Sequence, residues 1–484
     1  MIMKIDLKKI KYNNLGFFRF KKIKEKILLT NEYGEYIFLA EKDFKKFIEG
    51  KIDKTQEPYL SLARSNFVKD ELNISEFIDR YQKKNNFLFN GPSLHIMVVT
   101  LRCNYKCIYC HASAQNIKKT EMDMTLETAR KSLDVIFQTS SNFVVIEFQG
   151  GEPLVNWPVV KYIVEEARKR NKKAKKELEI RLISNFSMMT KDRYNFLIKN
   201  KVSFCASLDG PAELHNKNRP VSGGGDSHQY VAKWIKIFNQ DYPKIKNKGY
   251  IWKMSSIVVV SRYSLPYYKE IVDEYIKLGF SSLFFRPLNP FGFSKNIWGK
   301  INYSSNDFIK FYKKALDYII ELNLNGTHFV ERQAKIFLEK ILTKYDPDMM
   351  DLRSPCGAGI GQLAYNYNGD VYTCDEGRMV SMMGDESFRL GNVKNNSYQE
   401  IVSSPVTRTV CSASCLVGLA GCSDCVYAPY CGVCPIYNYY EQGSIFAQVP
   451  NNDRCKINQA ILDYLFEKLQ DKKVKKIFMN WLKK

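Results

Sequence analysis

The stretch "TLRCNYKCIYCHAS" at residues 100–113 sets three cysteines close together, directly after an apolar run. Cys103, Cys107 and Cys110 follow the pattern CxxxCxxC, which raises three hypotheses: a disulfide staple, a zinc site or an iron–sulfur site. Zinc takes four ligands and favours CxxC pairs that are followed by a second pair or by histidines. Three thiolates on one loop instead suit a [4Fe–4S] cluster that keeps one iron open to a small molecule.

The cellular compartment bears on this choice. The start "MIMKIDLKKIKYNN" lacks the apolar segment of a signal peptide, and no later apolar run reaches the ~20 residues of a membrane span. We therefore expect a cytoplasmic protein with no membrane partner. In that reducing compartment the thirteen cysteines favour metal ligation over disulfides.

The charge balance is strongly basic, with 73 Lys and Arg against 51 Asp and Glu, a net charge of +22. Such a charge can indicate nucleic-acid or membrane binding. Here the lysines are spread along the whole chain, and no nucleic-acid-binding motif accompanies them. The charge is therefore interpreted as solvated helix faces, and a nucleic-acid partner is disfavoured.

Strands and helices alternate after residue 94. Apolar strands are expected at 94–100, 143–149, 178–184, 202–208, 255–260 and 281–286, with amphipathic helices between them. This pattern predicts an α/β fold with a parallel sheet and right-handed crossovers, as an open, partial (β/α)6 barrel. Active sites in such folds gather at the carboxyl ends of the strands, where the cysteine loop falls.

The other segments differ in texture. Residues 1–88 predict a small α+β module, with a hairpin over 26–39, that either engages a peptide or serves as a packing extension. The expected division is an N-terminal module at 1–88, a core at 89–300, a helical connector at 301–352, a cysteine-rich domain at 353–455 and a C-terminal helix at 456–484.

The core resembles the radical S-adenosylmethionine (SAM) enzymes. Their hallmark is CxxxCxxC with an aromatic residue before the third cysteine, here Tyr109. "FQGGEP" (148–153) is similar to the family's GGEP motif, "LISNF" (182–186) to an element that contacts SAM, and "ASLDGP" (206–211) to a motif after the fifth strand. The cofactor-binding residues that the resemblance implies are Tyr109, Gly150, Gly151, Glu152, Ser184, Asn185, Ser207 and Asp209.

That resemblance implies a chemistry. Cys103, Cys107 and Cys110 would hold a [4Fe–4S] cluster whose open iron binds SAM. One electron, from a donor such as flavodoxin or ferredoxin, would cleave SAM to a 5′-deoxyadenosyl radical that abstracts hydrogen from an unactivated carbon.

Nine further cysteines lie between residues 356 and 455, and their spacing alone also allows two zinc ribbons. After a radical SAM core this field resembles the SPASM extension, which holds two auxiliary [4Fe–4S] clusters. The resemblance implies one cluster on Cys422, Cys425, Cys431 and Cys455, and a second on Cys356, Cys374 and Cys434. Cys415, Cys411 or the substrate would complete the second, and we assign Cys415. Two residues separate Cys431 from Cys434, where three are commoner in the family.

Asp375 directly follows Cys374. In the related sulfatase-maturing enzymes an aspartate at this place serves as a general base, so Asp375 is the catalytic hypothesis here. The alternative is a surface carboxylate beside a turn. A general base is needed only if the substrate loses a proton as well as a hydrogen atom.

SPASM proteins mostly modify peptides or proteins. Stretches such as "FRPLNPFGF" (285–293) and "CDEGRM" (374–379) resemble the maturase of the His-Xaa-Ser peptide system, which is often paired with a second radical SAM protein. The implied function is a peptide maturase that acts on a ribosomally made precursor, giving a crosslink, an epimer or an oxidised residue. The alternatives are a formylglycine-generating sulfatase maturase, a small-molecule maturase, or a metal-bearing RNA-binding protein. The sequence does not choose the bond formed, the modified residue or the oligomeric state.

Overall fold

The computed structural model describes residues 7–246 and 251–483, so the first six residues of the predicted N-terminal module and Lys484 lie outside it. The chain divides into two compact units. The first unit comprises residues 1–87, 334–356 and 413–484, and the second comprises 88–333 and 357–412. Each unit thus contains segments that are far apart in the sequence.

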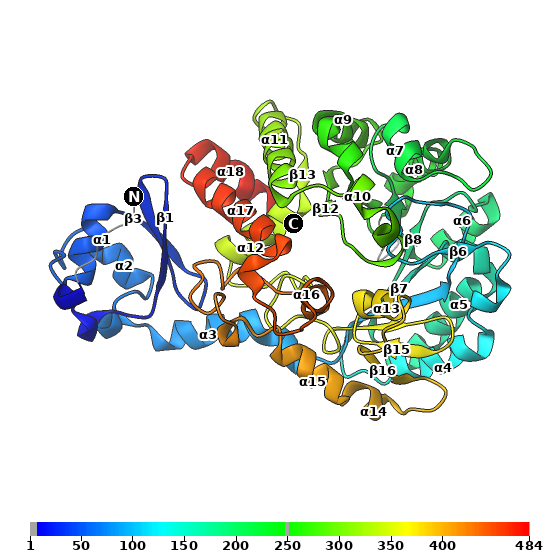
Figure 1. Cartoon of the computed structure of the whole chain (residues 1–484), viewed down its shortest axis with the longest axis horizontal. Coiled ribbons are helices and arrows are strands. Elements are labelled where there is room, and N and C mark those ends of the chain that lie inside the picture. The colour runs from blue at the N-terminus through cyan, green and yellow to red at the C-terminus, as the bar shows by residue number, and fades with distance from the viewer. Residues whose placement is uncertain (1–6, 247–250, 484) are drawn as a thin grey trace. The chain divides into compact units, whose positions relative to one another are not determined.

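The second unit is built on a nine-stranded sheet in the order β12-β10-β9-β8-β7-β4-β14-β15-β16. Six of its strands are parallel neighbours, and five of them lie where the alternating pattern predicted. The six are β4 (Leu94–Thr100), β7 (Phe143–Gly150), β8 (Glu177–Ser184), β9 (Val202–Ser207), β10 (Ser255–Val260) and β12 (Phe285–Pro287) (Figure 1). The strand expected at 281–286 is divided: β11 (Ser282–Leu283) pairs with β13 (Val330–Glu331) in a separate sheet, and only β12 joins the large one. The sheet stays open between β12 and β4, which confirms the α/β fold with a partial barrel.

Helices connect these strands. They include α4 (Leu126–Ile136), α5 (Trp157–Ala174), α6 (Lys191–Lys199), α7 (Ala212–Asn218), α8 (Ser227–Ile245), α9 (Tyr268–Lys277), α10 (Trp298–Ile301) and α11 (Ser305–Leu324). Side-chain oxygens cap several of them: Thr125 accepts the amide of Thr128, and Thr190 accepts that of Arg193. Val144, Ile146 and Phe148, which alternate along β7, are fully buried on one face of the sheet.

Three strands from the cysteine-rich segment extend the same sheet. β14 (Gln362–Tyr365) runs parallel to β4, and β15 (Asp370–Tyr372) and β16 (Arg389–Asn392) follow antiparallel. The short helices α13 (Asp375–Ser381), α14 (Tyr398–Val402) and α15 (Pro405–Ser412) lie in this part. The sequence analysis expected only turns here, because runs of three or four residues carry little periodicity.

The first unit contains a three-stranded antiparallel sheet of β1 (Arg19–Ile23), β2 (Lys26–Thr30) and β3 (Tyr36–Ala40). β2 and β3 form the predicted hairpin, whereas β1 was not foreseen. Its helices near the N-terminus are α1 (Glu41–Ile48), α2 (Tyr59–Arg64) and α3 (Ile74–Asn85). Buried Ile27, Leu29, Leu39, Phe44 and Phe47 form its core.

The predicted single C-terminal helix is wrong in one respect, because two helices occupy that stretch. α17 (Asp453–Lys468) ends before Leu469, and α18 (Lys472–Trp481) begins after Asp471. The Asp471 carboxylate accepts the amides of Lys473 and Val474, so this residue caps a new helix start. α12 (Arg332–Leu342), from Ala334 onward, and α16 (Pro435–Gln442) complete the first unit. In the described parts of the chain, no helix combines the length and apolarity needed to cross a membrane.

Candidate active site and cluster sites

The cysteine loop leaves the carboxyl end of β4 and brings its three thiols together. Each of Cys103, Cys107 and Cys110 interacts electrostatically with both of the others. Burial raises the pKa of all three thiols, that of Cys107 to about 12, and the neighbouring thiols raise it further. Three buried thiols that oppose one another's ionisation are suited to a cationic group that takes their protons' place.

Asp209 supports this loop from the end of β9. Its carboxylate, fully buried, accepts the hydroxyl of Tyr109 and forms an ion pair of 3.2 Å with Arg219. The guanidinium of Arg219 also lies 5.4 Å from the ring centroid of Tyr109. Asp209 was predicted to bind cofactor, and in this structure its contacts hold the aromatic residue between the thiols in place.

Arg219 was missed by the sequence analysis, and so was Arg378. Arg219 lowers the pKa of Cys107 and Arg378 lowers that of Cys110, against the larger effect of burial. The Arg378 side chain is 1% exposed and donates to the carbonyl of Ala112, next to the loop. The buried Arg378 and the nearly buried Arg219 therefore stabilise negative charge on the thiols. The sequence analysis quoted "CDEGRM", which contains Arg378, but gave that arginine no role, because its burial beside the cysteine loop depends on the fold.

The segment "FRPLNPFGF" closes on the cysteine loop from β12. The amide of Phe293 donates to the carbonyl of Cys110 at 3.1 Å. A Cβ at Gly292 would lie 2.5 Å from the carbonyl oxygen of His111, and φ there is +63°. Only glycine permits this approach, so Gly292 has a packing reason that the sequence analysis did not identify.

The two glycines after β7 bring that strand end against β4. A Cβ at Gly150 would lie 2.2 Å from the carbonyl oxygen of Thr100, and one at Gly151 would lie 2.2 Å from that of Arg102. Gly151 and Glu152 donate their amides to the same two carbonyls. The chain's own backbone therefore already requires both glycines, whichever ligand lies above them.

Glu152 links the ends of β7 and β8. Its carboxylate accepts the hydroxyl of Ser184 at 2.8 Å, the amide of Asn185 at 2.9 Å and the amide of Leu154 at 3.1 Å. Burial raises the pKa of Glu152 to about 7, although these hydrogen bonds lower it. The structure thus brings three of the predicted cofactor residues together around one buried carboxylate. Ser207, at the end of β9, pairs in register with Ile257 of β10.

Asp375 begins α13. Its Oδ1 accepts two hydrogen bonds of 3.0 Å from the guanidinium of the buried Arg378. The next residue, Glu376, forms an ion pair of 3.0 Å with Arg286 of β12. Asp375 also interacts electrostatically with Glu147 of β7. The predicted base therefore lies in a charged network of the second unit rather than on a solvated turn.

The second cysteine set falls in the first unit. Each of the thiols of Cys422, Cys425, Cys431 and Cys455 interacts electrostatically with the other three. Leu416, Leu419, Val433 and Val449 surround them with apolar contacts. Burial raises the pKa of all four thiols. Four coupled thiols in an apolar pocket fit the ligand set of one [4Fe–4S] cluster.

The remaining predicted ligands occupy both units. Cys374 in the second unit and Cys434 in the first are each the N-cap of a helix, and each Sγ accepts a backbone amide, at 3.3 and 3.4 Å. Such a position stabilises a thiolate. Cys356 donates its amide to the hydroxyl of Ser414, and Ser354 accepts the amide of Leu416. The segment that carries Cys415 thus runs beside Cys356, and the assignment of Cys415 as fourth ligand stays a prediction.

All thirteen cysteines lie in the described residues, and none is part of a disulfide. Over residues 7–246 and 251–483, no three or more His, Cys, Asp or Glu side chains are arranged to hold a single metal ion. A cubane cluster has a different requirement, because each of its thiolates binds a different iron.

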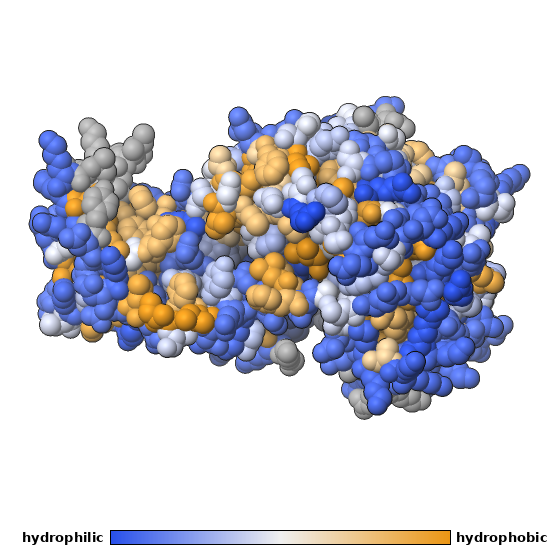
Figure 2. Space-filling model, turned by 90° about the horizontal axis from the view of Figure 1, so that it is seen from below, coloured by the Kyte–Doolittle hydropathy of each residue, from blue (hydrophilic) through white to orange (hydrophobic). Residues whose placement is uncertain are grey.

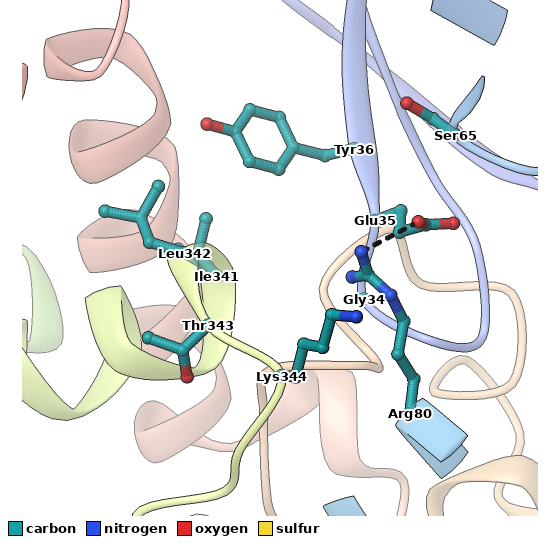
Figure 3. A pocket seen from close by; sticks show the side chains of 9 residues that line it. All are labelled: Gly34, Glu35, Tyr36, Ser65, Arg80, Ile341, Leu342, Thr343 and Lys344. Atoms are coloured by element: carbon teal, nitrogen blue, oxygen red, sulfur yellow. Dashed lines mark ion pairs between the residues drawn. The ribbon is translucent and has the colours of Figure 1, made fainter. Parts of the chain in front are cut away.

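A cavity of ≈ 310 Å³ opens in the first unit between the start of β3, α3 and the end of α12. Figure 3 shows Arg80 and Lys344 pointing toward its middle, with Arg80 paired to Glu35 at 3.3 Å. Glu35 is buried and accepts the amides of Asn31 and Asn66 as well. The cavity is lined by Gly34, Glu35, Tyr36, Ser65, Arg80, Ile341, Leu342, Thr343 and Lys344.

Helix α3 also exposes apolar side chains near this cavity. Ile74, Ile78 and Tyr81 are all about half exposed and are spaced by four and three residues, so they fall on one side of the helix. Figure 2 shows apolar side chains at the surface among hydrophilic ones in the N-terminal part of the molecule. Exposed apolar strips of this kind commonly bind other chains.

The family of this fold and site is established by comparison with known proteins. The model of the radical SAM superfamily matches residues 97–252, and that of the iron–sulfur cluster-binding SPASM domain matches residues 356–435. This chain is a radical SAM enzyme with a SPASM domain.

The chain is similar to several known proteins. A cysteine-type anaerobic sulfatase-maturating enzyme of Clostridium perfringens is 28% identical over 319 residues, which are 64% of this chain and 79% of that protein. A solved anaerobic sulfatase-maturating enzyme with bound AdoMet and a peptide gives a TM-score of 0.64 at 23% identity, covering 80% of this chain and 99% of the other. SuiB of Streptococcus suis bound to the precursor peptide SuiA gives 0.53 at 15%, covering 90% and 98%.

The family assigns the cofactors, and the residues present fit them. The enzyme uses S-adenosylmethionine, a [4Fe–4S] cluster in the radical SAM domain and auxiliary [4Fe–4S] clusters in the SPASM domain. Two groups of mutually coupled, buried thiols, one of three and one of four, match an open and a closed cluster site. The fit rests on these thiols' arrangement and on the arginines beside the group of three.

Proposed function

We propose that this enzyme is a peptide maturase: it abstracts hydrogen from a residue of a ribosomally made precursor peptide and leaves a crosslink, an epimer or an oxidised residue. Its place would be the cytoplasm, with a flavodoxin or ferredoxin as electron donor and, in a paired system, a second maturase. The observation that carries the proposal is how much of the chain each solved relative accounts for.

The match to the sulfatase-maturating structure includes 99% of that structure but only 80% of this chain. The SuiB structure, whose printed partner is a precursor peptide, covers 90%. The SuiB structure therefore accounts for a larger share of this chain than the sulfatase-maturating structure does. This larger share supports a precursor peptide as the substrate.

Each side chain of the core has a part in this proposal. Cys103, Cys107 and Cys110 would hold the cluster that, with SAM, supplies a 5′-deoxyadenosyl radical. Glu152 would accept the SAM amino group, held in place by Ser184 and by the amide of Asn185. Gly150, Gly151 and Ser207 lie at the neighbouring strand ends, and Asp209 fixes Tyr109 over the loop.

Asp375 is proposed as the base that removes a proton from the substrate after hydrogen abstraction. Arg378 holds one of its oxygens through two hydrogen bonds, which orients the carboxylate. A reaction that forms a bond by loss of two electrons requires such a base, whereas an epimerisation does not.

The N-terminal module is proposed to engage the peptide at the cavity of Figure 3. Arg80 and Lys344 are the cations that line this cavity, and two carboxylates pair with them: Glu35 with Arg80 at 3.3 Å, and Glu76 with both cations at 3.1 Å. The apolar strip of Ile74, Ile78 and Tyr81 on α3 would bind apolar residues of the same peptide. A precursor segment with apolar side chains suits this strip, and an acidic side chain of the same segment could take the place of Glu76 beside Lys344.

Oxidation of a cysteine in a sulfatase to formylglycine is the second candidate. It is favoured by the 28% identity to the cysteine-type enzyme of Clostridium perfringens and by an aspartate directly after Cys374. Both functions share the radical chemistry, so only the substrate separates them.

The experiment compares substrates. Anaerobically reconstituted enzyme is given SAM, dithionite and either short peptides encoded next to its gene or a synthetic sulfatase peptide with a cysteine. We expect 5′-deoxyadenosine to rise with an encoded peptide, whose mass changes in step. A mass change of the sulfatase peptide alone would establish the second candidate, and 5′-deoxyadenosine that no peptide increases would contradict both.

A further inference from the structure

The N-terminal sheet and the four-cysteine site of the first unit are in direct contact. Ser423 and Val426 lie on the loop that carries Cys422 and Cys425. The Nε of Arg19, on β1, donates to the carbonyl of Ser423 at 2.6 Å, and the hydroxyl of Thr30, on β2, donates to that of Val426 at 2.7 Å. The module therefore holds the backbone of the ligand loop through two of that loop's carbonyl groups.

Two cations from β1 accompany these contacts. Arg19 is buried, with its side chain 6% exposed. Lys21 lies on the same face of the strand, pairs with Asp463 of α17 at 2.8 Å and sits 5.0 Å from the ring centroid of Tyr427. Lys22 points the other way and pairs with Glu41 on the surface. Strand geometry thus directs alternate residues of β1 toward the cysteine loop.

We propose that Arg19 and Lys21 set the reduction potential of the auxiliary cluster held by Cys422, Cys425, Cys431 and Cys455, so that the N-terminal module is part of that cluster's electrostatic environment. The inference rests on the auxiliary cluster, and not on which peptide is modified. Reduction adds one negative charge to the cluster, and a nearby buried cation stabilises the reduced form more than the oxidised form.

The contacts of the ligand loop give the sign of each charge. Arg19 donates to the carbonyl of Ser423, next to Cys422, and Lys21 lies over the ring of Tyr427, two residues after Cys425. The carboxylate of Asp463 accepts the hydroxyl of the same Tyr427. The two cations should therefore favour the extra electron of a reduced cluster, and the carboxylate should oppose it.

The test measures the reduction potentials of the auxiliary clusters by an EPR-monitored titration. All proteins carry the Cys103/Cys107/Cys110→Ala background, which removes the SAM-binding cluster, and are reconstituted with iron and sulfide. The variants are Arg19→Gln, Lys21→Gln and Asp463→Asn, and Lys22→Gln is the matched control from the outer face of the same strand. Iron content and circular dichroism confirm that each variant is folded and loaded.

We expect Arg19→Gln to lower the ratio of reduced to oxidised cluster at a fixed potential about tenfold, which corresponds to 59 mV for a one-electron couple. Lys21→Gln should lower it less, because the Lys21 side chain is 37% exposed and solvent screens its charge. Asp463→Asn should raise the potential, and Lys22→Gln should leave it unchanged. Only one auxiliary signal should move. Opposite signs at Lys21 and Asp463 separate charge from mere structural damage, since breaking their ion pair from either side would otherwise have the same effect.

Arg19→Lys keeps the positive charge and should therefore keep the reduction potential. It is measured in place of Arg19→Gln if that variant does not retain its iron. Equal potentials in all loaded variants would overturn the inference while leaving the enzyme's function untouched. Absence of the auxiliary iron from the unsubstituted protein would instead contradict the cluster itself, so the two failures are distinguishable.

Discussion

The cysteine group at 103–110 and the cysteine group at 422–455 are held in place by different parts of the fold. The group at 103–110 places three thiols on one loop and is supported by side chains that follow β9, β12 and β15 of the sheet that carries it. The group at 422–455 spreads four thiols over two loops and the start of α17, and its loop is held by strands from the beginning of the chain. The first group is a short motif at the carboxyl end of a sheet strand. The second is supported only when residues 19–30 pack against the loop at 422–426.

The difference also concerns charge. The buried Arg378 and the nearly buried Arg219 stand beside the group of three, and Arg19, Lys21 and Lys340 stand beside the group of four. Cations in both places offset the cost of burying a negative cluster. Three cysteines would leave one iron of the cluster open for SAM, whereas four would complete the ligand set. We therefore expect substitutions of the cations beside the group of four to change the reduction potential of its cluster rather than the binding of SAM.

The comparison predicts its largest effect at Cys103. Cys103→Ala should abolish 5′-deoxyadenosine formation and remove about four irons, since one cubane loses a ligand that its open site cannot spare. HPLC of reaction mixtures and iron analysis measure this, with Cys205→Ala, a buried cysteine on β9 that lies outside both groups, as the control for iron content. Retained SAM cleavage in Cys103→Ala would refute the assignment of the group of three.

Cys425→Ala tests the other side of the comparison. We expect SAM binding to persist while peptide product falls at least tenfold, because this thiol belongs to the closed set and lies outside the SAM-binding motifs. Product is followed by mass spectrometry and SAM binding by calorimetry on the same reconstituted sample. A loaded, folded Cys425→Ala enzyme with full product formation would contradict a role for the group of four.

Sequence and structure agree most closely where the information is local. Five of the six parallel strands and the three-cysteine loop were predictable, because the hydrophobic period of a strand, its turn residues and a compact motif each lie within a few residues. The sixth was expected at 281–286, but the chain divides there between β11 and β12, which belong to different sheets. Arg219 and Arg378 were not, since a lone arginine on a connection resembles any solvated residue until the fold buries it.

The first unit shows the other limit. β1 carries Arg19 and Lys21, whose alternation with exposed residues looks like an ordinary basic surface strand. Their place beside the four-cysteine loop becomes visible only in the fold, where residues 19–30 contact residues 423–427, about four hundred positions later. Nothing in the local pattern encodes that pairing. The strands β14–β16 escaped for a simpler reason, because each is too short to show a period.

A smaller effect is expected from the pH dependence of SAM binding through Glu152. Burial raises the pKa of this carboxyl to about 7 in the ligand-free enzyme. A cationic ligand prefers the ionised form, so SAM affinity should increase by up to tenfold per pH unit below 7 and level off above it. Calorimetry at pH 6, 7 and 8 measures this. Glu152→Gln should bind SAM more weakly with no such slope, and a flat profile in the unsubstituted enzyme would argue against the contact.

Substitutions at the cavity of Figure 3 should change peptide affinity by a factor no larger than the one expected for SAM affinity. Arg80→Ala or Lys344→Ala removes one cation from this cavity and should weaken binding of an acidic precursor peptide about tenfold, with a reduced salt dependence. Fluorescence anisotropy with a labelled peptide gives the affinity. Lys51, exposed on the same module and paired with Glu49, provides the control Lys51→Ala. Unchanged affinity in both cavity variants would place the peptide elsewhere.

The smallest effect concerns how the N-terminal sheet holds the four-cysteine loop. Thr30→Val keeps the shape of the side chain but leaves the carbonyl of Val426 without the hydroxyl that now donates to it, at a cost of about 1–3 kcal/mol in the free energy of unfolding. Thr55→Val removes an exposed hydroxyl from the same module and should cost less. If the sheet is a support for the cluster, Thr30→Val should also speed the loss of one auxiliary cluster to a chelator, while the cluster at Cys103 is unaffected. Equal bleaching of all clusters would mean that the hydroxyl stabilises the protein generally, and the contrast between a cluster held by its own sheet and one held by a distant module would lose its energetic basis.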